Sequence, residues 1–141
     1  MDKTFTRTFT VVGNNFTDAG KVSTEIKMIL KQLGINSTII RRVAIASYES
    51  EMNVVMYANK ADISLVVSPS EIQIVVEDVG PGIPDIELAM KEGFSTATTE
   101  MREMGFGAGM GLPNIKRNAD IFNIESIMGK GTKLNITVSL N

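Results

Sequence analysis

Two hydrophobic periodicities alternate along this chain of 141 residues. In the first, apolar and polar residues alternate, which is typical of a strand with one buried face. In the second, apolar residues recur every three or four positions, which is typical of a helix. The alternating period predicts strands at residues 4–12, 61–67, 71–77, 121–128 and 132–140. The helical period predicts helices at about 18–33, 37–59 and 112–119, with a weaker short helix at 84–90.

Capping residues set the expected ends of the two longest helices. Thr17 or Asp18 is expected to cap the first helix, because such side-chain oxygens accept backbone N–H groups. Asn36 or Ser37 is expected to cap the second helix in the same way. Gly34 is the expected end of the first helix, since glycine readily takes a left-handed conformation there.

The order of these elements predicts the fold class. One strand, two helices, two strands, a long segment, one helix and two strands fit an α/β (α+β) two-layer sandwich. Its sheet would be mixed and mostly antiparallel, with the helices on one face, and 61–67 and 71–77 would form a hairpin around residues 68–70. Residues from about 85 to 104 lack a regular pattern, as mobile lids often do. The length predicts one domain over residues 1–141.

The composition excludes several kinds of chemistry. The chain has no Cys and no His, which excludes disulfides, thiolate metal sites, His-ligated zinc and His-based triads. Its 14 basic and 16 acidic residues leave a net charge of −2, which argues against nucleic acid or an anionic membrane as a partner. No apolar run approaches the ~20 residues of a membrane helix. The N-terminus has no apolar signal core, so a cytoplasmic location is expected.

Two polar residues, Glu49 and Asn53, interrupt the apolar pattern of the second predicted helix. A spacing of four places both side chains on one helix face. In a functional interpretation, the carboxylate orients or deprotonates a nucleophile. The amide oxygen beside it binds Mg²⁺, which prefers hard oxygen ligands. In the alternative interpretation, the pair is a solvated edge of the helix.

A carboxylate and two glycines follow directly after the strand predicted at 71–77. The segment reads Asp78-Val79-Gly80-Pro81-Gly82-Ile83. A carboxylate at a strand end can accept a hydrogen bond from an exocyclic amine such as adenine N6. Glycines beside it allow a base to lie close to the backbone. An ordinary turn with an aspartate cap is the alternative interpretation.

A second glycine cluster precedes the last predicted helix. It reads Gly105-Phe106-Gly107-Ala108-Gly109-Met110-Gly111-Leu112. Backbone N–H groups of a glycine-rich turn, together with a helix N-terminus, favour a phosphate group. The cluster is not a Walker loop, because Leu112-Pro113 follows Gly111 in place of Lys-Ser/Thr. It does not follow a strand of a βαβ unit, so the dinucleotide motif is absent as well. A flexible loop is the alternative interpretation.

The motifs together are more specific than any one of them. In order, they are Glu-x3-Asn on a helix, Asp-x-Gly-x-Gly-Ile after a strand, Gly-x-Gly-x-Gly-Leu opening a helix, and Gly-x-Gly-Thr at 129–132. In this combination the chain resembles the GHKL ATPase superfamily, which includes gyrase, a heat-shock chaperone, sensor histidine kinases and mismatch-repair ATPases. The resemblance covers about residues 5–140 and implies the Bergerat ATP-binding fold, an α/β sandwich with a mixed sheet under helices.

The resemblance implies a role for each matched residue. Glu49 would assist the attacking hydroxyl, and Asn53 would bind Mg²⁺ and, through it, ATP. The residues expected around the adenine base are Asp78, Gly80, Gly82, Ile83 and Thr132. The residues expected at the phosphates are Gly107, Ala108, Gly109, Gly111 and Leu112. Residues from about 85 to 104 would form the ATP lid, whose few basic residues leave open which cation faces the γ-phosphate.

Within the superfamily, the chain resembles the small bacterial serine kinases of the anti-sigma-factor and stressosome-switch group. Tyr57 stands where anti-sigma kinases usually carry His. Residues 109–117 are similar to Gly-Leu-Gly-Leu-Pro-Gly-x-Lys-Arg of the switch branch. The resemblance implies an ATP- and Mg²⁺-dependent serine/threonine-protein kinase that phosphorylates a STAS-domain antagonist protein. By partner switching, it would regulate a sigma factor or a PPM-type serine phosphatase.

Two other functions compete with this interpretation. The chain could be an ATP-gated binding module, an anti-sigma factor with little or no kinase activity, and partner retention by Glu49→Ala would help to distinguish the two. A fragment of a sensor histidine kinase is disfavoured, because the chain has no His and no dimerisation helix. As often in the group of small kinases, a homodimer is a further expectation.

Overall fold

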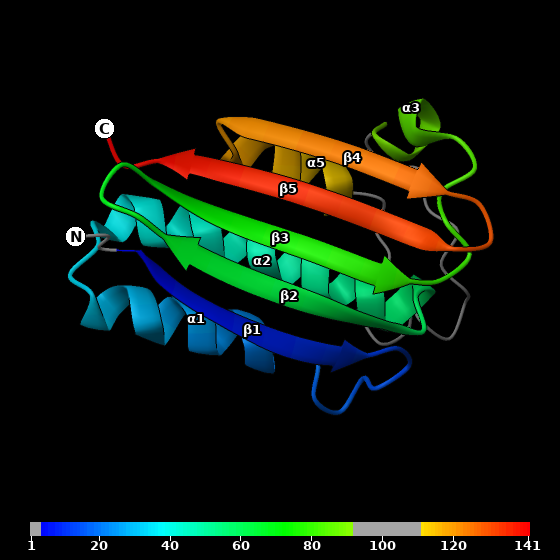
Figure 1. Cartoon of the computed structure of the whole chain (residues 1–141), viewed down its shortest axis with the longest axis horizontal. Helices are drawn as coiled ribbons and strands as arrows, with labels where there is room; N and C mark the ends of the chain where they lie inside the picture. Colours follow the sequence, from blue (N-terminus) through cyan, green and yellow to red (C-terminus); the bar gives the residue numbers. More distant parts are fainter. Residues whose placement is uncertain (1–3, 92–110) are drawn as a thin grey trace.

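The computed structural model of the chain describes residues 4–91 and 111–141. Its centre is a five-stranded sheet, and helices α1, α2 and α5 lie against one face of that sheet (Figure 1). The strands are β1 Phe5–Val12, β2 Lys60–Val67, β3 Glu71–Val79, β4 Ile121–Ile127 and β5 Gly131–Ser139. The helices are α1 Lys21–Gln32, α2 Ser37–Tyr57, α3 Ile86–Ala89 and α5 Gly111–Asn118.

The strands lie in the order β1-β2-β3-β5-β4, so the last strand of the chain is inserted between β3 and β4. All four neighbouring pairs of these described strands are antiparallel. The predicted hairpin is confirmed, with Val67 opposite Ile72 in the β2–β3 register. The predicted fold class, a two-layer α/β sandwich, is confirmed as well, and the pairs that the structure describes include no parallel one.

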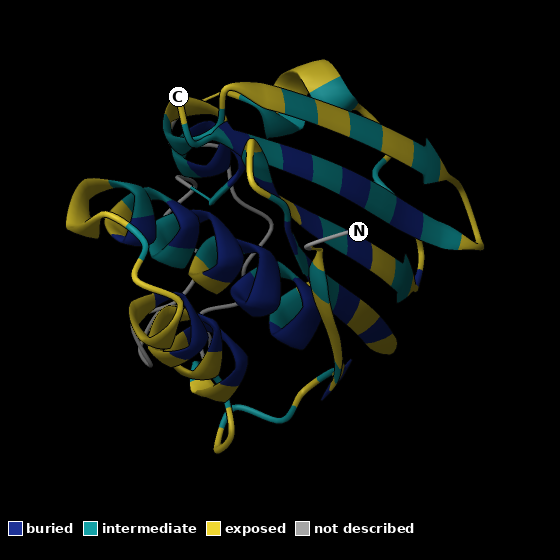
Figure 2. Cartoon of the chain, turned by 60° about the vertical axis from the view of Figure 1, so that its left-hand side comes forward, coloured by how far each residue is buried: buried dark blue, intermediate teal, exposed yellow. Residues whose placement is uncertain are grey.

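The core lies between the sheet and the helices. Buried strand residues alternate with exposed or half-buried ones, which gives β2, β3 and β5 the banded pattern of Figure 2. Ile63, Leu65, Ile74 and Ile136 are examples of strand residues that are at most 1% exposed. Each such side chain contributes roughly 1.5–3 kcal/mol by leaving water. This alternation is the physical reason why the period of two predicted the strands.

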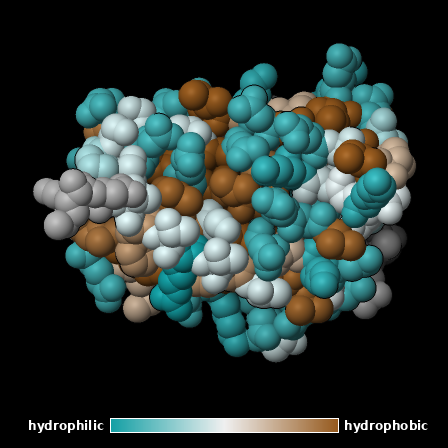
Figure 3. All heavy atoms as spheres, viewed as in Figure 1, coloured by the Kyte–Doolittle hydropathy of each residue, from teal (hydrophilic) through white to brown (hydrophobic). Residues whose placement is uncertain are grey.

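Within the described part of the chain, no helix covers the other face of the sheet. Polar and apolar side chains are interspersed on that face (Figure 3). Cross-strand polar pairs occupy part of it, such as the Thr8 and Ser64 hydroxyls at 3.0 Å and Thr10 with Asp62 at 3.3 Å. None of the described helices is both long and apolar enough to cross a membrane.

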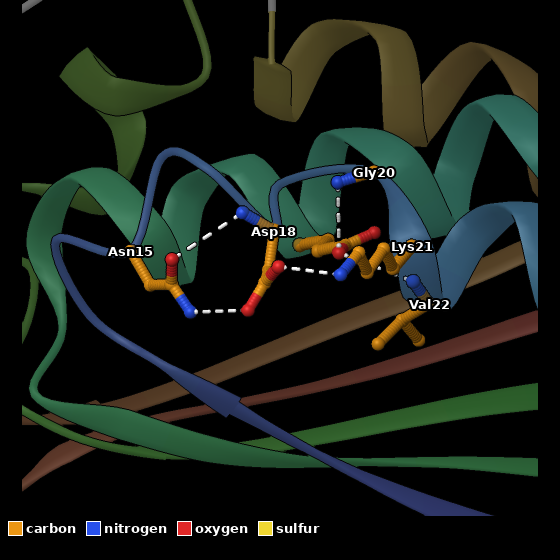
Figure 4. A network of polar contacts seen from close by, with 6 residues as sticks. Asn15, Asp18, Gly20, Lys21 and Val22 are labelled. Atoms are coloured by element: carbon orange, nitrogen blue, oxygen red, sulfur yellow. Dashed lines mark hydrogen bonds and ion pairs between the residues drawn. The ribbon is translucent and has the colours of Figure 1, made fainter.

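The predicted cap of α1 is wrong. Neither Thr17 nor Asp18 caps it; the N-cap is Gly20, at φ 98°, which offers no side-chain acceptor. The Asp18 carboxylate is instead held by Asn15 Nδ2 at 2.8 Å and Lys21 Nζ at 2.6 Å (Figure 4). The preference of aspartate for a cap was therefore overridden by these local polar partners.

A buried carboxylate from α2 takes the place of the missing cap. Glu51 is 1% exposed, and its two oxygens accept backbone N–H groups from Gly20 at 3.0 Å, Val22 at 3.3 Å and Ser23 at 3.0 Å. The first N–H groups of a helix have no partner inside it, and the helix dipole favours a negative charge there. Glu51 thus fastens the beginning of α1 to the middle of α2.

The other predicted helix ends agree with the structure. Asn36 caps α2, and its side-chain oxygen accepts from the Thr38 N–H at 2.8 Å. Gly34 follows the last residues of α1 with a left-handed φ of 76°. The short helix predicted within 84–90 is α3, which Asp85 caps by accepting from the Leu88 N–H at 3.0 Å.

Candidate functional site

The predicted site residues that the structure describes form two groups of contacts. The Asp78 group consists of the residues expected around the base: Asp78, Gly80, Gly82, Ile83 and Thr132. The Glu49 group consists of Glu49 and Asn53 on α2 with Gly111 and Leu112 at the start of α5. Gly107, Ala108 and Gly109 lie outside the described residues. The part of the predicted lid that follows Lys91 lies outside them as well.

Asp78 lies near the end of β3 and is held from β5. Its Oδ1 accepts the backbone N–H of Thr132 at 2.9 Å, and Thr132 is 8% exposed. Burial raises the pKa of the Asp78 carboxyl, while the hydrogen bond from Thr132 opposes that rise. The other oxygen of Asp78, Oδ2, accepts no hydrogen bond from the described residues. No buried side-chain oxygen among these residues lacks a partner, so Oδ2 is not fully buried. It can therefore accept an N–H group of a ligand.

Ser126 on β4 belongs to this group, and the sequence reasoning missed it. Its Oγ accepts the backbone N–H of Ile83 at 2.7 Å and lies 2.9 Å from the hydroxyl of Thr132. Ser126 therefore links the glycine turn after β3 to Thr132 on β5, whose backbone N–H holds Asp78. A serine inside an alternating strand carries no distinctive signal, so only its position in the sheet identifies it.

Close backbone approaches require glycine at two positions here: Gly82, in the Asp78 group, and Gly131, next to Thr132. Gly82 has a φ of 83°, and a Cβ there would lie 2.8 Å from the carbonyl oxygen of Ile127. A Cβ at Gly131 would overlap the carbonyl oxygen of Asp78. The turn after β3 thus packs directly on the β4–β5 turn, where the Gly80 N–H donates to the Lys130 carbonyl at 3.0 Å.

Glu49 has one hydrogen-bond partner among the described residues. Its Oε2 accepts from the side-chain amide of Asn114 on α5 at 2.7 Å. The amide oxygen of Asn114 in turn accepts from Arg117 at 3.0 Å. The carboxylate is half-buried, and its other oxygen has no donor from residues 4–91 or 111–141. The motif analysis did not single out Asn114, because its contact with Glu49 joins residues 65 positions apart.

Asn53 lies against the first residue of α5. A Cβ added to Gly111 would come within 3.1 Å of the Asn53 side-chain oxygen, so the backbone passes close to this amide. Leu112 next to it is 8% exposed and packs in the core, which anchors the start of α5. The structure therefore brings Glu49 and Asn53 together with the beginning of α5. The spacing of four predicted only that the two side chains share one face of α2.

The two groups meet near the C-terminal end of α2. The Asn59 N–H donates to the Val79 carbonyl at 2.8 Å, just before the glycine turn. A Cβ on Gly80 would lie 3.1 Å from the Cα of Ala58. Ala58 follows Asn53 by five residues, about 7.5 Å along a helix axis. The Asp78 group and the Glu49 group therefore border one region of the molecule.

The donor atoms of the Glu49 group are compatible with Mg²⁺. The Asn53 amide and the Glu49 carboxylate offer hard oxygen atoms, which this ion prefers. Within the described residues, no cluster of three or more His, Cys, Asp or Glu side chains could hold a metal by itself. Mg²⁺ often takes only one or two protein ligands and completes its shell with phosphates and water. The chemistry of these residues therefore fits an ion that is shared with a bound phosphate compound.

Comparison with known proteins identifies the family of the chain. The model of the histidine kinase-, DNA gyrase B-, and HSP90-like ATPase family matches residues 39–141. The sensor histidine kinase MprB from mycobacteria has a similar structure, with a TM-score of 0.57 and coverage of 99% of this chain and 97% of that one. Its sequence identity is 15%, so this likeness concerns the fold alone.

Two curated relatives are more similar in sequence. The chain is 36% identical over 110 residues to the serine/threonine-protein kinase RsbT of Bacillus subtilis (strain 168), which covers 75% of this chain and 77% of RsbT. It is 34% identical over 101 residues to the anti-sigma F factor of Thermoanaerobacter sp. (strain X514), which covers 72% of this chain and 63% of that protein.

Proposed function

Because the chain belongs to the histidine kinase-, DNA gyrase B- and HSP90-like ATPase family, we propose that it is an ATP-dependent serine/threonine-protein kinase. The name of its relative RsbT supports this activity. The observation that carries the proposal is the position of Glu49, whose half-buried carboxylate lies beside Asn53 at the start of α5. Residues 1–141 would form a single kinase domain.

The Asp78 group would bind the adenine base. A carboxylate with one free oxygen accepts the N6 amine of adenine, and the pair of Ser126 and Thr132 hydroxyls lies directly beside it. The close packing at Gly82 and Gly131 supports a fixed shape for this pocket. GTP carries a carbonyl where ATP carries the amine, so Asp78 would select ATP.

The Glu49 group would carry out the phosphoryl transfer. The hydroxyl oxygen of a Ser or Thr on the partner attacks the γ-phosphorus, and a new O–P bond forms. The bond from that phosphorus to the β,γ-bridging oxygen breaks, and its electron pair leaves with ADP. The hydroxyl proton passes to the free oxygen of Glu49, the one that Asn114 does not hold. Such transfers depend mainly on positioning and electrostatics.

Asn53 would be the protein ligand of Mg²⁺, with Gly111 leaving space beside its oxygen. When bound, the ion would supply positive charge that stabilises the negative charge of the phosphates. The N-terminal N–H groups of α5, with Gly111 and Leu112 at its start, would hold phosphate oxygens as helix N-termini do. Gly107, Ala108 and Gly109 are proposed for the same role from the motif alone.

The substrate would be a STAS-domain antagonist protein, and the output would be control of a sigma factor or a PPM-type phosphatase by partner switching. The names of the relatives, a serine/threonine-protein kinase and an anti-sigma factor, support this kind of partner. The second candidate function is an ATP-gated binding module, which the anti-sigma relatives favour. The homodimer stays a prediction.

Capture of partners from native lysate, followed by Mg-ATP and intact-mass measurement, tests the proposal. A small STAS-domain protein that gains one phosphate with wild-type protein, but not with Glu49→Gln, is the expected result. Glu125→Gln is the matched control, because Glu125 is an exposed strand residue on β4 outside both groups. A partner that binds in an ATP-dependent way and stays unmodified would overturn the kinase and favour the binding module.

A further inference from the structure

We infer that Asn114 is a positioning residue of the phosphoryl transfer, which holds the Glu49 carboxylate with one oxygen free to take the proton. This inference rests on the proposed kinase function and adds to it a residue that the family motif does not assign. Asn114 stands where the similar motif of the switch branch has glycine.

The contact engages one oxygen of Glu49 and leaves the other available. The side-chain amide of Asn114 donates to Oε2 at 2.7 Å, a short distance for a hydrogen bond from nitrogen to oxygen. A hydrogen bond to one carboxylate oxygen restricts rotation of the glutamate, whose side chain is otherwise long and mobile. The proton acceptor of the reaction would therefore be held in one orientation before the substrate arrives.

Arg117 determines which end of the Asn114 amide faces Glu49. Its guanidinium, which can only donate hydrogen bonds, lies 3.0 Å from the amide oxygen. An ionised carboxylate can only accept, so the amide nitrogen must turn toward Glu49. Arg117 and Glu49 thus orient the same amide from its two ends, and the network has one consistent set of donors and acceptors.

The beginning of α5 is aligned with the site residues of α2. Gly111 lies against the Asn53 oxygen, and Asn114, three residues later, reaches Glu49, four residues before Asn53. One turn of α5 therefore touches both the proposed metal ligand and the proposed base. The side chain of Asn118 donates to the backbone carbonyl of Asn114 at 2.8 Å, one turn further along α5.

The variant Asn114→Asp separates positioning from packing. Aspartate has nearly the same shape as asparagine and keeps an acceptor for Arg117, but it replaces the donor facing Glu49 with an acceptor. A purely structural role predicts wild-type transfer or better. A positioning role predicts a fall of about 10- to 100-fold in the rate of transfer at saturating ATP, with the KM for ATP within about twofold.

The assay uses wild-type protein, Mg-ATP and the STAS-domain protein that wild-type protein phosphorylates. Asn123→Asp is the matched control, since it makes the same substitution at an exposed residue of β4 outside both groups, and it is expected to keep the wild-type rate. Asn114→Ala, which removes the donor without adding charge, is expected to fall between wild type and Asn114→Asp. Thermal unfolding of each variant establishes that the proteins compared are folded.

The double variant Glu49→Gln with Asn114→Asp tests whether Asn114 affects the rate of transfer through Glu49. If Asn114 acts through Glu49, Asn114→Asp costs nothing further in the Glu49→Gln background. Wild-type transfer by Asn114→Asp, a gain by Asn114→Ala, or equal losses in both backgrounds would overturn the inference while leaving the kinase intact. If Glu49→Gln itself transfers phosphate at the wild-type rate, the inference fails together with the proposed role of Glu49, while the kinase function stands. If no acceptor is phosphorylated at all, the proposed function fails and the inference fails with it.

Discussion

Two carboxylates of α2, only two residues apart, each face the beginning of another helix, and their surroundings differ. Glu51 is 1% exposed and accepts three backbone N–H groups at the start of α1. Glu49 is half-buried and accepts one side-chain amide at the start of α5. Both oxygens of Glu51 accept hydrogen bonds from the chain itself. Only one oxygen of Glu49 accepts a hydrogen bond from the described residues, so the other can accept one from a ligand.

The difference in contacts explains why Glu49, and not Glu51, is the proposed proton acceptor. A carboxylate surrounded by fixed N–H donors stabilises the structure but has no free oxygen to take a proton. A carboxylate with a single donor contributes little to folding and remains able to react. Both residues are glutamates, so their different proposed roles rest on their contacts and not on the type of side chain.

The largest expected effect is the loss of transfer in Glu49→Gln. We expect the rate of phosphoryl transfer to fall by about 10²- to 10⁴-fold, because the amide cannot take the hydroxyl proton. The free energy of unfolding should change by less than about 0.5 kcal/mol, since the site is half-exposed. Transfer is measured as the initial rate of phosphoprotein formation and stability by urea unfolding. If Glu49→Gln lost stability and kept its rate of transfer, Glu49 would have a structural role like that of Glu51, and the proposed difference between the two would be wrong.

Glu51→Ala should show the reverse pattern. Three backbone N–H groups at the start of α1 would lose their acceptor, which we expect to cost about 3 kcal/mol of unfolding free energy. Transfer per folded molecule should stay within about threefold of wild type below the unfolding temperature. Urea unfolding and the same kinase assay measure both quantities. Unchanged stability would mean that water replaces the carboxylate at the start of α1.

Asp78→Asn tests a third carboxylate, one with a single backbone donor and a proposed ligand. The asparagine side chain can still accept from the Thr132 N–H, but it loses the charge that would hold the N6 amine of adenine. We expect ATP to bind about 10- to 100-fold more weakly, which corresponds to about 1.5–3 kcal/mol, with a much smaller change for GTP. Fluorescence titration with both nucleotides measures this. Equal losses for ATP and GTP would contradict the assignment of the base.

The smallest expected effect is the pH dependence that Asp78 confers on stability. Burial raises the pKa of its carboxyl above the ordinary 3.8, so the folded chain binds this proton more tightly than the unfolded chain does. The carboxyl therefore lowers the stability of wild-type protein, relative to Asp78→Asn, as pH rises from below 3.8 through the raised pKa. We expect the variant to be slightly more stable at neutral pH, with the difference shrinking toward pH 3. Urea unfolding of both proteins across this range measures it, and a difference that widens at low pH would contradict it.

Much of the fold and part of the site could be predicted from local patterns. Alternating residues such as Ile72, Ile74 and Val76 mark a half-buried strand, because successive side chains point to opposite faces. Glu49 and Asn53 were correctly placed on one face of α2, since the helical period is a local property. A sharp turn at the glycines after Asp78 was predicted, because glycine tolerates conformations that a Cβ disfavours, and Gly82 has a φ of 83°.

The remaining features depend on contacts between distant parts of the chain. The cap of α1 was predicted at Thr17 or Asp18 and is supplied by Glu51, about 30 positions away. Asn114 and Ser126 acquire their roles only through partners that lie 65 and 43 residues away, respectively. A single polar residue has the same appearance in a sequence whether it meets solvent or another element. Local pattern therefore does not identify its partner.

The sequence by itself determined the order of the elements, their buried faces and the motifs of a nucleotide site, because periodicity and glycine conformation act over a few residues. The tertiary structure alone decided that β5 lies between β3 and β4, that Glu51 caps α1, and that Asn114 holds Glu49. These depend on which elements pack together, and packing is set by the burial of the whole apolar core at once.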